Sequence, residues 1–231
     1  LLFTVNLTAN EQFNFNVTEI EIKENGNKFF GKKGGVATTD DGLFIEAKEF
    51  EYDKISNILK VNGKVRFNHE EKNFFIFSDR ATYLKNKEKL YTLGNSKAIN
   101  ENGIVITANE LRYNKFKNTI DAIGDVKIID PNIDTVIYAE KTTYFKNEEK
   151  IITNGKTKVI VESEYTFKSN DLVFLRNEMK LISNNYSTIV EKNSTIYELE
   201  MFKYFIIDKV LKGEDAKVVT NPSKENSDEF Y

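Results

Sequence analysis

The sequence repeats itself at intervals of 30 or 31 residues. The clearest marker is an aromatic column, which consists of Tyr52, Tyr83, Tyr113, Tyr144, Phe174 and Tyr204. A unit this short cannot bury its own apolar face, so neighbouring copies must stack and share one continuous core. The chain is therefore predicted to fold as a linear stack of similar units.

Four more columns keep the same phase over about 150 residues. Within each repeat they lie at fixed distances before or after the aromatic residue. They are a large apolar column (Ile45, Ile76, Ile106, Ile137, Phe167), a small column (Ala47, Ser78, Ala108, Ala139, Ser169), an aliphatic column (Leu59, Leu90, Ile120, Ile151, Leu181) and a glycine column (Gly63, Gly94, Gly124, Gly155, then Asn185). Agreement among so many columns does not arise by chance.

Apolar and polar residues alternate inside each repeat. Leu43, Ile45 and Ala47 show this alternation, and residues 59–67 continue it. A period of two over this length is typical of half-buried strands and not of helices. The intervening stretches, such as residues 52–57, are rich in Asn, Lys and Asp, which is typical of turns. Each repeat is predicted to be a strand, a polar turn and a second strand that kinks at the recurring glycine.

Composition narrows the class of protein further. The chain has eighteen Phe, eleven Tyr and no Trp, and aromatic and β-branched residues suit pleated strands. Its net charge is −3 with both signs mixed along the chain, so no basic stripe indicates a nucleic-acid partner. The absence of cysteine excludes disulfides and thiolate metal ligands. No apolar run is long enough to span a bilayer.

The inventory of catalytic residues is poor. The one histidine, His69, lies in a charged link and is expected to be a solvated surface residue. Triads that need histidine and most zinc sites are therefore not expected. Carboxylates such as Glu46 and Glu49 are explained by a solvated face. Gly34 and Gly35 lie between predicted short strands, without the Lys-Ser/Thr of a phosphate-binding loop. The chain is predicted to have no catalytic residue, no metal site and no cofactor.

The two ends of the sequence differ from the repeats. Residues 1–9 are mostly apolar, end in Ala9 and do not begin with Met, so they are interpreted as a signal-peptide remnant; an ordinary first strand is the alternative. Residues 10–221 are assigned to the repeat domain. From Pro222 the composition turns polar, and residues 222–231 are interpreted as a linker towards a further, C-terminal domain.

The columns are predicted to place one set of side chains inside the stack. Two interpretations of this interior are open: a filled sandwich core, or two sheets that stay apart and leave a groove for acyl chains. The small column favours the groove, because it leaves volume beside the large apolar column. The predicted lining consists of Ile45, Ala47, Leu59, Val65, Phe67, Ile76, Ser78, Leu90, Ile106, Ala108, Ile120, Val126, Ile128, Ile137, Ala139 and Ile151.

This combination of columns resembles the OstA-type domain family, which includes the periplasmic part of the LPS-assembly outer-membrane protein LptD and the periplasmic bridge protein LptA. The motif is carried by Ile45-Glu-Ala47, Tyr52, Leu59 and Gly63-Lys-Val65, and again by Ile106-Thr-Ala108, Tyr113, Ile120 and Gly124-Asp-Val126. The resemblance covers residues 13–219. It implies an all-β fold, an elongated β-jellyroll that is open along one edge and built here from about six stacked two-strand repeats of about 30 residues.

The resemblance also implies a function, in which the interior shields the lipid A acyl chains of lipopolysaccharide and passes the lipid to the outer membrane. The chain would be a periplasmic domain associated with that membrane, as in the N-terminal part of LptD, although the cysteines that tie barrel to jellyroll in some members are absent. The alternatives are a soluble LptA-like bridge and a dry-cored structural β-repeat stalk.

The implied partners are lipopolysaccharide, a strand partner of the same family and, in a longer chain, an outer-membrane barrel with its plug lipoprotein. An edge-to-edge partner would dock by adding a strand to an open sheet edge. The predicted docking edge is the N-terminal strand with Phe13, Phe15, Val17, Ile20 and Ile22.

Overall fold

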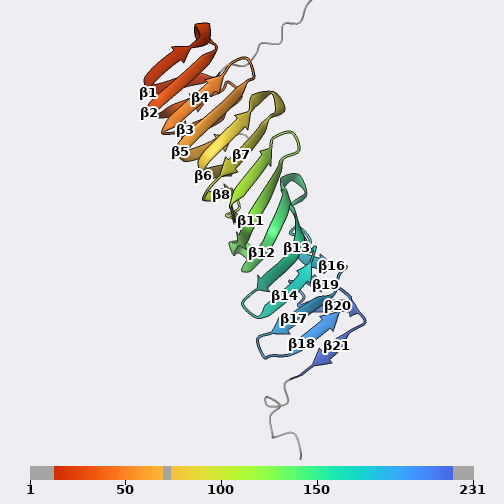
Figure 1. Cartoon of the computed structure of the whole chain (residues 1–231). Helices are drawn as coiled ribbons and strands as arrows, with labels where there is room; N and C mark the ends of the chain where they lie inside the picture. Colours follow the sequence, from red (N-terminus) through yellow and green to blue (C-terminus); the bar gives the residue numbers. More distant parts are fainter. Residues whose placement is uncertain (1–12, 70–73, 221–231) are drawn as a thin grey trace, which may run out of the picture.

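The protein is an elongated stack of antiparallel strands. A computed structural model describes residues 13–69 and 74–220. The strands follow one another along the long axis, with β1 (Asn14–Lys23) at one end and β21 (Lys217–Val219) at the other (Figure 1). Every pairing among the described strands is antiparallel. The predicted class, an elongated all-β jellyroll, is confirmed.

The remaining strands lie between these two in chain order. They are β2 (Lys28–Thr38), β3 (Leu43–Ala47), β4 (Glu49–Asp53), β5 (Ile58–His69), β6 (Phe74–Leu84), β7 (Lys89–Leu93), β8 (Ser96–Asn100), β9 (Val105–Ala108), β10 (Glu110–Asn114), β11 (Thr119–Asp130), β12 (Thr135–Phe145), β13 (Lys150–Val161), β14 (Tyr165–Asn170), β15 (Val173–Leu175), β16 (Lys180–Ser183), β17 (Ser187–Glu191), β18 (Ile196–Leu199), β19 (Met201–Phe205) and β20 (Val210–Glu214). Single 3-10 turns occur at Glu24–Gly26, Lys85–Lys87, Pro131–Ile133 and Lys146–Glu148.

The sheet folds over at a corner that runs along one side of the stack. In β5 the pairing with β6 shifts register between Asn62 and Val65, where Gly63 has a φ of +81°. Before the shift β5 pairs with β4, and after it β5 pairs with β3. The same change of partner recurs in β2, β11 and β13. One sheet thus becomes two facing halves. The tyrosine half carries the aromatic column, and the isoleucine half carries the large apolar column.

The glycine column supplies these corners, as the sequence predicts. Gly94, Gly124 and Gly155 have φ values between +76° and +80°, a left-handed conformation that a side chain disfavours. A bulge at such a position bends the strand and increases its twist. The backbone stays paired through the bend. The backbone N–H of Asp79 donates to the Gly94 carbonyl oxygen, and that of Asn109 donates to the Gly124 carbonyl oxygen, both at 2.9 Å.

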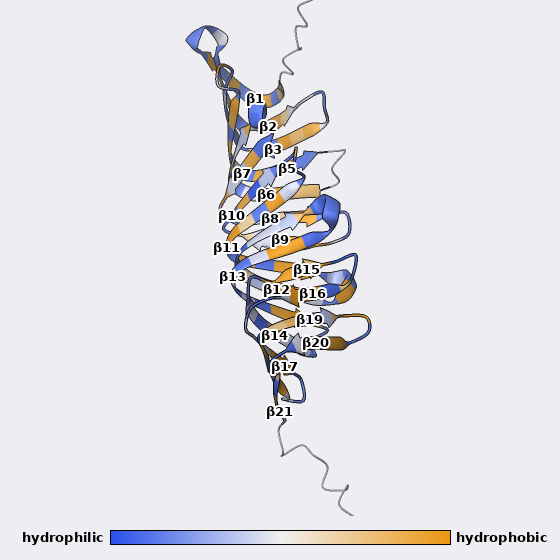
Figure 2. Cartoon of the chain, turned by 90° about the vertical axis from the view of Figure 1, so that its right-hand side faces the viewer, coloured by the Kyte–Doolittle hydropathy of each residue, from blue (hydrophilic) through white to orange (hydrophobic). Residues whose placement is uncertain are grey.

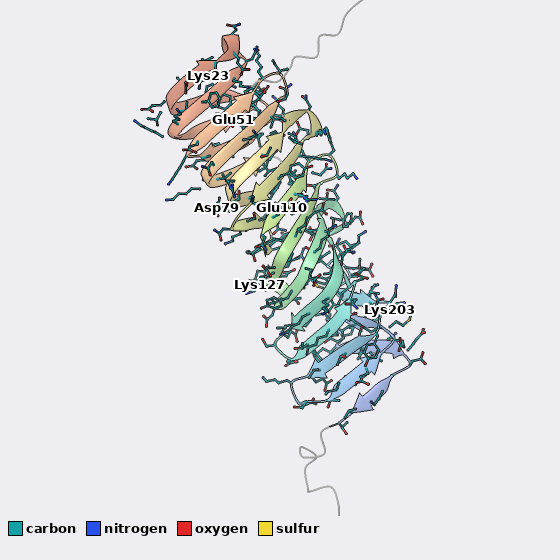
Figure 3. The ribbon with its side chains drawn as sticks, in the orientation of Figure 1. Lys23, Glu51, Asp79, Glu110, Lys127 and Lys203 are labelled. Atoms are coloured by element: carbon teal, nitrogen blue, oxygen red, sulfur yellow. The ribbon has the colours of Figure 1, made fainter. Side chains whose placement is uncertain are left out.

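The columns that the sequence assigns to the interior are buried between the two halves. None of the sixteen predicted lining residues is more than 9% exposed. Apolar and polar stretches alternate along the ribbon (Figure 2), and charged side chains such as Glu51, Lys127 and Lys203 project from the stack (Figure 3). The predicted inward direction of the columns, and therefore the strand register, is confirmed.

The expectation that His69 is a solvated surface residue is wrong. Only 1% of its surface is exposed. It is the last residue of β5 and continues the inward alternation of Phe67, so it lies opposite Leu43 on β3 and Phe74 on β6. The polar residues that follow it in the sequence conceal this alternation.

Gly34 and Gly35 also differ from expectation, since both lie inside the single long strand β2 and not between short strands. β2 turns the corner there, and a Cβ built on Gly35 would lie 2.4 Å from the Asn16 carbonyl oxygen of β1. Glycine is therefore required where the two backbones approach. The predicted signal-peptide remnant and linker, residues 1–9 and 222–231, lie outside the described residues.

Candidate functional site

The candidate site is the apolar space between the tyrosine half and the isoleucine half. Neighbouring strands place large side chains opposite one another along its wall; Ile128, for example, lies opposite both Ile106 and Ile137. Nearer the tyrosine half, the rings of Phe74 and Tyr113 pack with centroids 4.5 Å apart. All five side chains are fully buried. Through the middle of the stack, the protein's own side chains fill the space.

The interior opens at the C-terminal end of the stack. A cavity of about 400 Å³ lies between β14, β17 and β18 of the isoleucine half and β19 and β20 of the tyrosine half. Its lining includes the apolar side chains of Phe167, Ile189, Tyr197 and Leu211. Leu211 belongs to β20, which pairs with no described strand other than β19, so no described strand continues the sheet over this end of the interior.

Apolar side chains are also uncovered at the opposite end. β1, the predicted docking edge, pairs with no described strand other than β2 and is therefore an edge strand. Phe13, Phe15 and Val17 pack on the core, whereas Ile20 and Ile22 are 57% and 60% exposed. The structure thus divides the predicted docking residues into three that anchor the strand and two that are available to a partner.

Across from the corner, the two halves face each other at a mouth that is lined mostly by polar side chains. On the tyrosine half, the second residue after each aromatic one is basic in five consecutive repeats; we call these residues the rim cations. They are Lys54, Lys85, Lys115, Lys146 and Arg176. On the isoleucine half, the sixth residue after the glycine column lines the mouth, and these residues are His69, Asn100, Asp130, Val161 and Glu191.

Lys115 joins the two halves across the mouth. Its Nζ contacts the carboxylate of Asp41, in the turn after β2, and that of Glu88, in the turn after β6, the latter at 3.1 Å. His69 Nε2 lies 3.7 Å from the same Asp41 carboxylate. Burial raises the pKa of Asp41, but hydrogen bonds from Lys115 and Thr39, together with the nearby positive charge, lower it to about 2. Asp41 is therefore an anion at neutral pH.

A second bridge lies two repeats further along the mouth. The Arg176 Nε donates to Asp130 Oδ2 at 2.5 Å, and its Nη1 donates to Glu149. Burial lowers the pKa of the Arg176 guanidinium, but these two carboxylates raise it above its ordinary value. Beside them the Tyr144 hydroxyl donates to Glu149 at 2.9 Å and accepts from Asn100 at 3.3 Å. The mouth is thus closed by charged and polar contacts, while the interior behind it is apolar.

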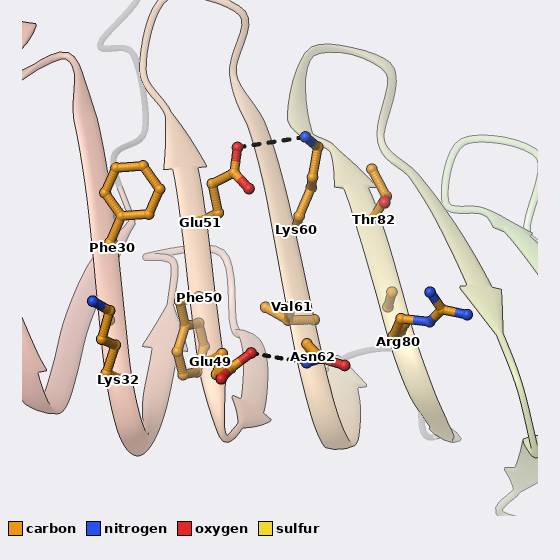
Figure 4. A pocket seen from close by; sticks show the side chains of 12 residues that line it. Phe30, Lys32, Glu49, Phe50, Glu51, Lys60, Val61, Asn62, Arg80 and Thr82 are labelled. Carbon is orange, nitrogen blue, oxygen red and sulfur yellow. Dashed lines mark hydrogen bonds and ion pairs between the residues drawn. The ribbon is translucent and has the colours of Figure 1, made fainter. Parts of the chain in front are cut away.

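Another hollow, of about 390 Å³, lies on the outer face of β2, β4, β5 and β6 (Figure 4). Glu51 pairs there with Lys60 at 3.4 Å, and Glu49 accepts from Asn62 at 2.8 Å. Each carboxylate is thus engaged by the neighbouring strand. Within residues 13–69 and 74–220, no cluster of three or more His, Asp or Glu side chains is placed to hold a metal ion. In the same residues, no helix has the length and apolar character that crossing a membrane requires.

The rim cations and their partners are functional candidates that the predicted site residues do not include. The sequence attributes Lys and Asn in these stretches to turns. The recurrence of a basic residue two positions after the aromatic column, in five consecutive repeats, is the signal that could identify them. Turn geometry alone does not require a cation at that position.

Comparison with known proteins finds no matching family model and no matching curated protein. Among solved structures, LptH of Pseudomonas aeruginosa, the LptA homologous periplasmic component of a lipopolysaccharide transport device, is 9% identical; the match covers 66% of this chain and 97% of LptH, with a TM-score of 0.29. The TCP10 domain of Danio rerio CPAP, in complex with a STIL peptide, is 12% identical over 87% of this chain and 97% of that one, with a TM-score of 0.20. Both TM-scores are too low for a shared function to follow.

Proposed function

We propose that this domain binds lipopolysaccharide in the periplasm and shields its lipid A acyl chains in the apolar interior. The observation that carries the proposal is a continuous apolar interior that no described strand covers at either end. Ile20 and Ile22 are exposed at one end, and Phe167 and Leu211 line a cavity at the other. A rigid stalk gains nothing from such ends, because exposed apolar surface promotes association.

The regularity of the wall supports transport over storage. Exposing an acyl chain to water costs about 0.8 kcal/mol for each methylene, so a carrier must cover the chain at every step. Successive repeats present similar side chains, such as Ile106 and Ile137, at the same depth. A chain therefore finds nearly the same contacts at each level and can move along the stack instead of being held at one place.

The filled middle of the stack requires that the two halves separate when lipid enters. The glycine corners join the two halves along one side of the stack, and the mouth lies along the other side. The small column, with Ala108 and Ala139 in the central repeats, lies towards the corner, where its short side chains occupy less of the interior than those of the large apolar column. Entry through the mouth, with the corner as a hinge, is the movement that this arrangement favours.

Photo-crosslinking in cells tests the proposal. A photoreactive residue in place of Ile106 or Ile137 is expected to capture lipopolysaccharide, because both side chains point into the interior. Tyr138 is a matched control, since it follows Ile137 in β12 and points outward with 39% of its surface exposed. Equal capture at positions 137 and 138, or no capture at 106 and 137, would reject the conduit.

The dry-cored stalk is the second candidate, and the complete burial of the central ladder favours it. Ile106, Ile128 and Ile137 are each at most 2% exposed. Under that reading, no position in the interior captures lipid in cells, whereas the domain keeps its elongated shape and stability.

We further propose that the domain joins others of its family end to end by strand addition, which would continue the interior from one domain to the next. Among the described strands, β1 has a neighbour on one side only, and β20 likewise has one neighbour at the other end. Proline in place of Val17 or Thr18 is expected to abolish docking of the partner, by removing a donor or kinking the edge, and to leave lipid binding by the isolated domain intact. Docking that survives both substitutions would exclude β1 as the interface.

The finer assignment is a periplasmic domain of an LptD-type protein, which delivers lipid at the outer membrane to a barrel and its plug lipoprotein. Its support is the resemblance of the repeat columns to that family. Fractionation of cells that express the natural gene tests it. Recovery with the outer membrane is expected, and recovery as a free periplasmic protein would favour an LptA-like bridge.

A further inference from the structure

The mouth carries a regular charge pattern that shielding acyl chains does not require. The rim cations occupy one position in five consecutive repeats, and three of them, Lys85, Lys115 and Arg176, are largely withdrawn from solvent. The side chains of Lys115 and Arg176 are 20% and 10% exposed, whereas that of Lys60 on the outer face is 58% exposed. Cations are seldom buried to this degree unless an anion holds them.

Lys115 and Arg176 are each bound by one carboxylate from their own half and one from the facing half. The two sets are Lys115 with Glu88 and Asp41, and Arg176 with Glu149 and Asp130. When the halves separate to admit acyl chains, the facing carboxylates move away and those of the same half stay. Each cation then needs a replacement anion, because a partly buried charge without full compensation is costly.

A spare hydrogen-bond donor lies two residues before Lys115. Tyr113 is 1% exposed, and its hydroxyl has no hydrogen-bond partner within the described part of the chain. At the equivalent positions, Tyr83 and Tyr144 donate to carboxylates. A buried hydroxyl without an acceptor is uncommon in proteins, and an oxygen of a ligand at the mouth would satisfy it.

We propose that the mouth holds two binding positions for the anionic head group of an amphiphile whose acyl chains occupy the interior: Lys115 with the Tyr113 hydroxyl form one, and Arg176, two repeats further along, forms the other. Asp41 and Asp130 hold the place of that head group while the interior is empty. The inference rests on the proposed function and adds a basis for selectivity: phosphate or carboxylate head groups are preferred to uncharged ones. A guanidinium and an ammonium at the rim suit phosphate oxygens, since both form charge-assisted hydrogen bonds.

The test compares dodecyl phosphate with dodecyl maltoside, which share one acyl chain and differ in head-group charge. Each displaces the uncharged dye Nile red from the purified domain, below its critical micelle concentration. The measured quantity is the ratio of the two affinities. Wild type is expected to favour dodecyl phosphate, and D41N/D130N is expected to raise this preference, because the rim cations lose their competitors.

Substitution of the cations separates a head-group site from a simple latch. K115M/R176M also frees the two halves, so a latch alone predicts stronger binding of both probes and an unchanged ratio. A head-group site predicts that the preference for dodecyl phosphate falls about tenfold, as expected for lost charge-assisted bonds. An unchanged ratio in both double variants would overturn the proposal.

Two controls keep the result interpretable. The variant K60M/K203M removes two exposed positive charges away from the mouth, as many as K115M/R176M removes at it, and should leave the ratio unchanged; an equal fall there would mean nonspecific attraction and would also overturn the site. If K115M/R176M does not fold, K115M and Y113F are measured separately, with a smaller fall in the ratio expected in each. Wild type that binds both probes equally overturns only the head-group site, whereas wild type that binds neither overturns the proposed function itself.

Discussion

At the scale of single residues, two tyrosines one repeat apart allow a direct comparison. The Tyr144 hydroxyl bonds both Glu149 and Asn100, whereas the Tyr113 hydroxyl has no partner within the described residues. Y144F is expected to cost about 1 kcal/mol of unfolding free energy, because it leaves Asn100 without its acceptor. Y113F is expected to change stability by less than about 0.5 kcal/mol. Urea unfolding measures both, and equal losses would contradict the assignment of the hydrogen bonds.

The Asp41 carboxyl leads to a prediction about the stability of the protein at acid pH. Its folded pKa of about 2 lies below the ordinary value of 3.8, so the folded state prefers the anion. The stability that this preference adds is fully present at a pH above the pKa of the unfolded state, and it is lost as the pH falls through the pKa of the folded state. D41N is expected to be about 1 kcal/mol less stable than wild type at pH 7, allowing for solvent screening, and equally stable near pH 2. A difference that persists at acid pH would mean that Asp41 acts through packing and not through charge.

At the scale of the strand, the corners depend on residues without a Cβ. Gly124 and Gly155 share the left-handed conformation, with φ values of +76° and +79°. A Cβ on Gly124 would lie 2.7 Å from Asn109 Nδ2, which is itself bonded to Asp125, whereas a Cβ on Gly155 would meet nothing closer than 3.4 Å. G155A is expected to cost about 1 kcal/mol for the conformation alone, and G124A to cost more.

Denaturant unfolding of G124A and G155A separates the two costs. Both variants pay the cost of the left-handed backbone, but only G124A adds a close contact with a side chain. If G155A is as damaging as G124A, the conformation dominates. If neither variant is destabilised, the corners tolerate side chains, and the glycine column needs another explanation.

The strands show which features can be predicted from the sequence. Period two and the glycine column predict the inward set and the corner, because burial and backbone conformation are local properties that recur in every repeat. The same pattern extends one step further than polarity suggests, to His69 and Lys115, which point inward at the mouth although their neighbours are charged. Polar composition predicts exposure on average, but the face of the strand to which a side chain points decides its exposure at each position.

At the scale of the whole molecule, the pairing across the mouth could not be predicted from the repeat. Lys115 and Asp41 are 74 residues apart, and Arg176 and Asp130 are 46 apart. Neither separation follows from the repeat alone, because the cations and the carboxylates occupy different positions within the repeat and the twist of the sheet offsets the two halves along the axis. The sequence period determines which side chains reach the mouth, and the twist of the sheet determines which of them meet.

The linear arrangement makes a last prediction about how the protein opens. Backbone pairing joins each strand only to its neighbours in the stack, so unfolding is expected to begin at the ends and to progress inward. β12 pairs with β11 on one side and β13 on the other along its length, whereas β1, β20 and β21 each have one partner among the described strands. Hydrogen exchange should therefore be slowest in β12 and fastest in the end strands. Docking of a partner by strand addition should slow exchange in β1 and leave β12 unchanged. Equal protection along the stack would mean one cooperative unit, and protection of β12 without β1 would place the partner on the side of the stack and not at its end.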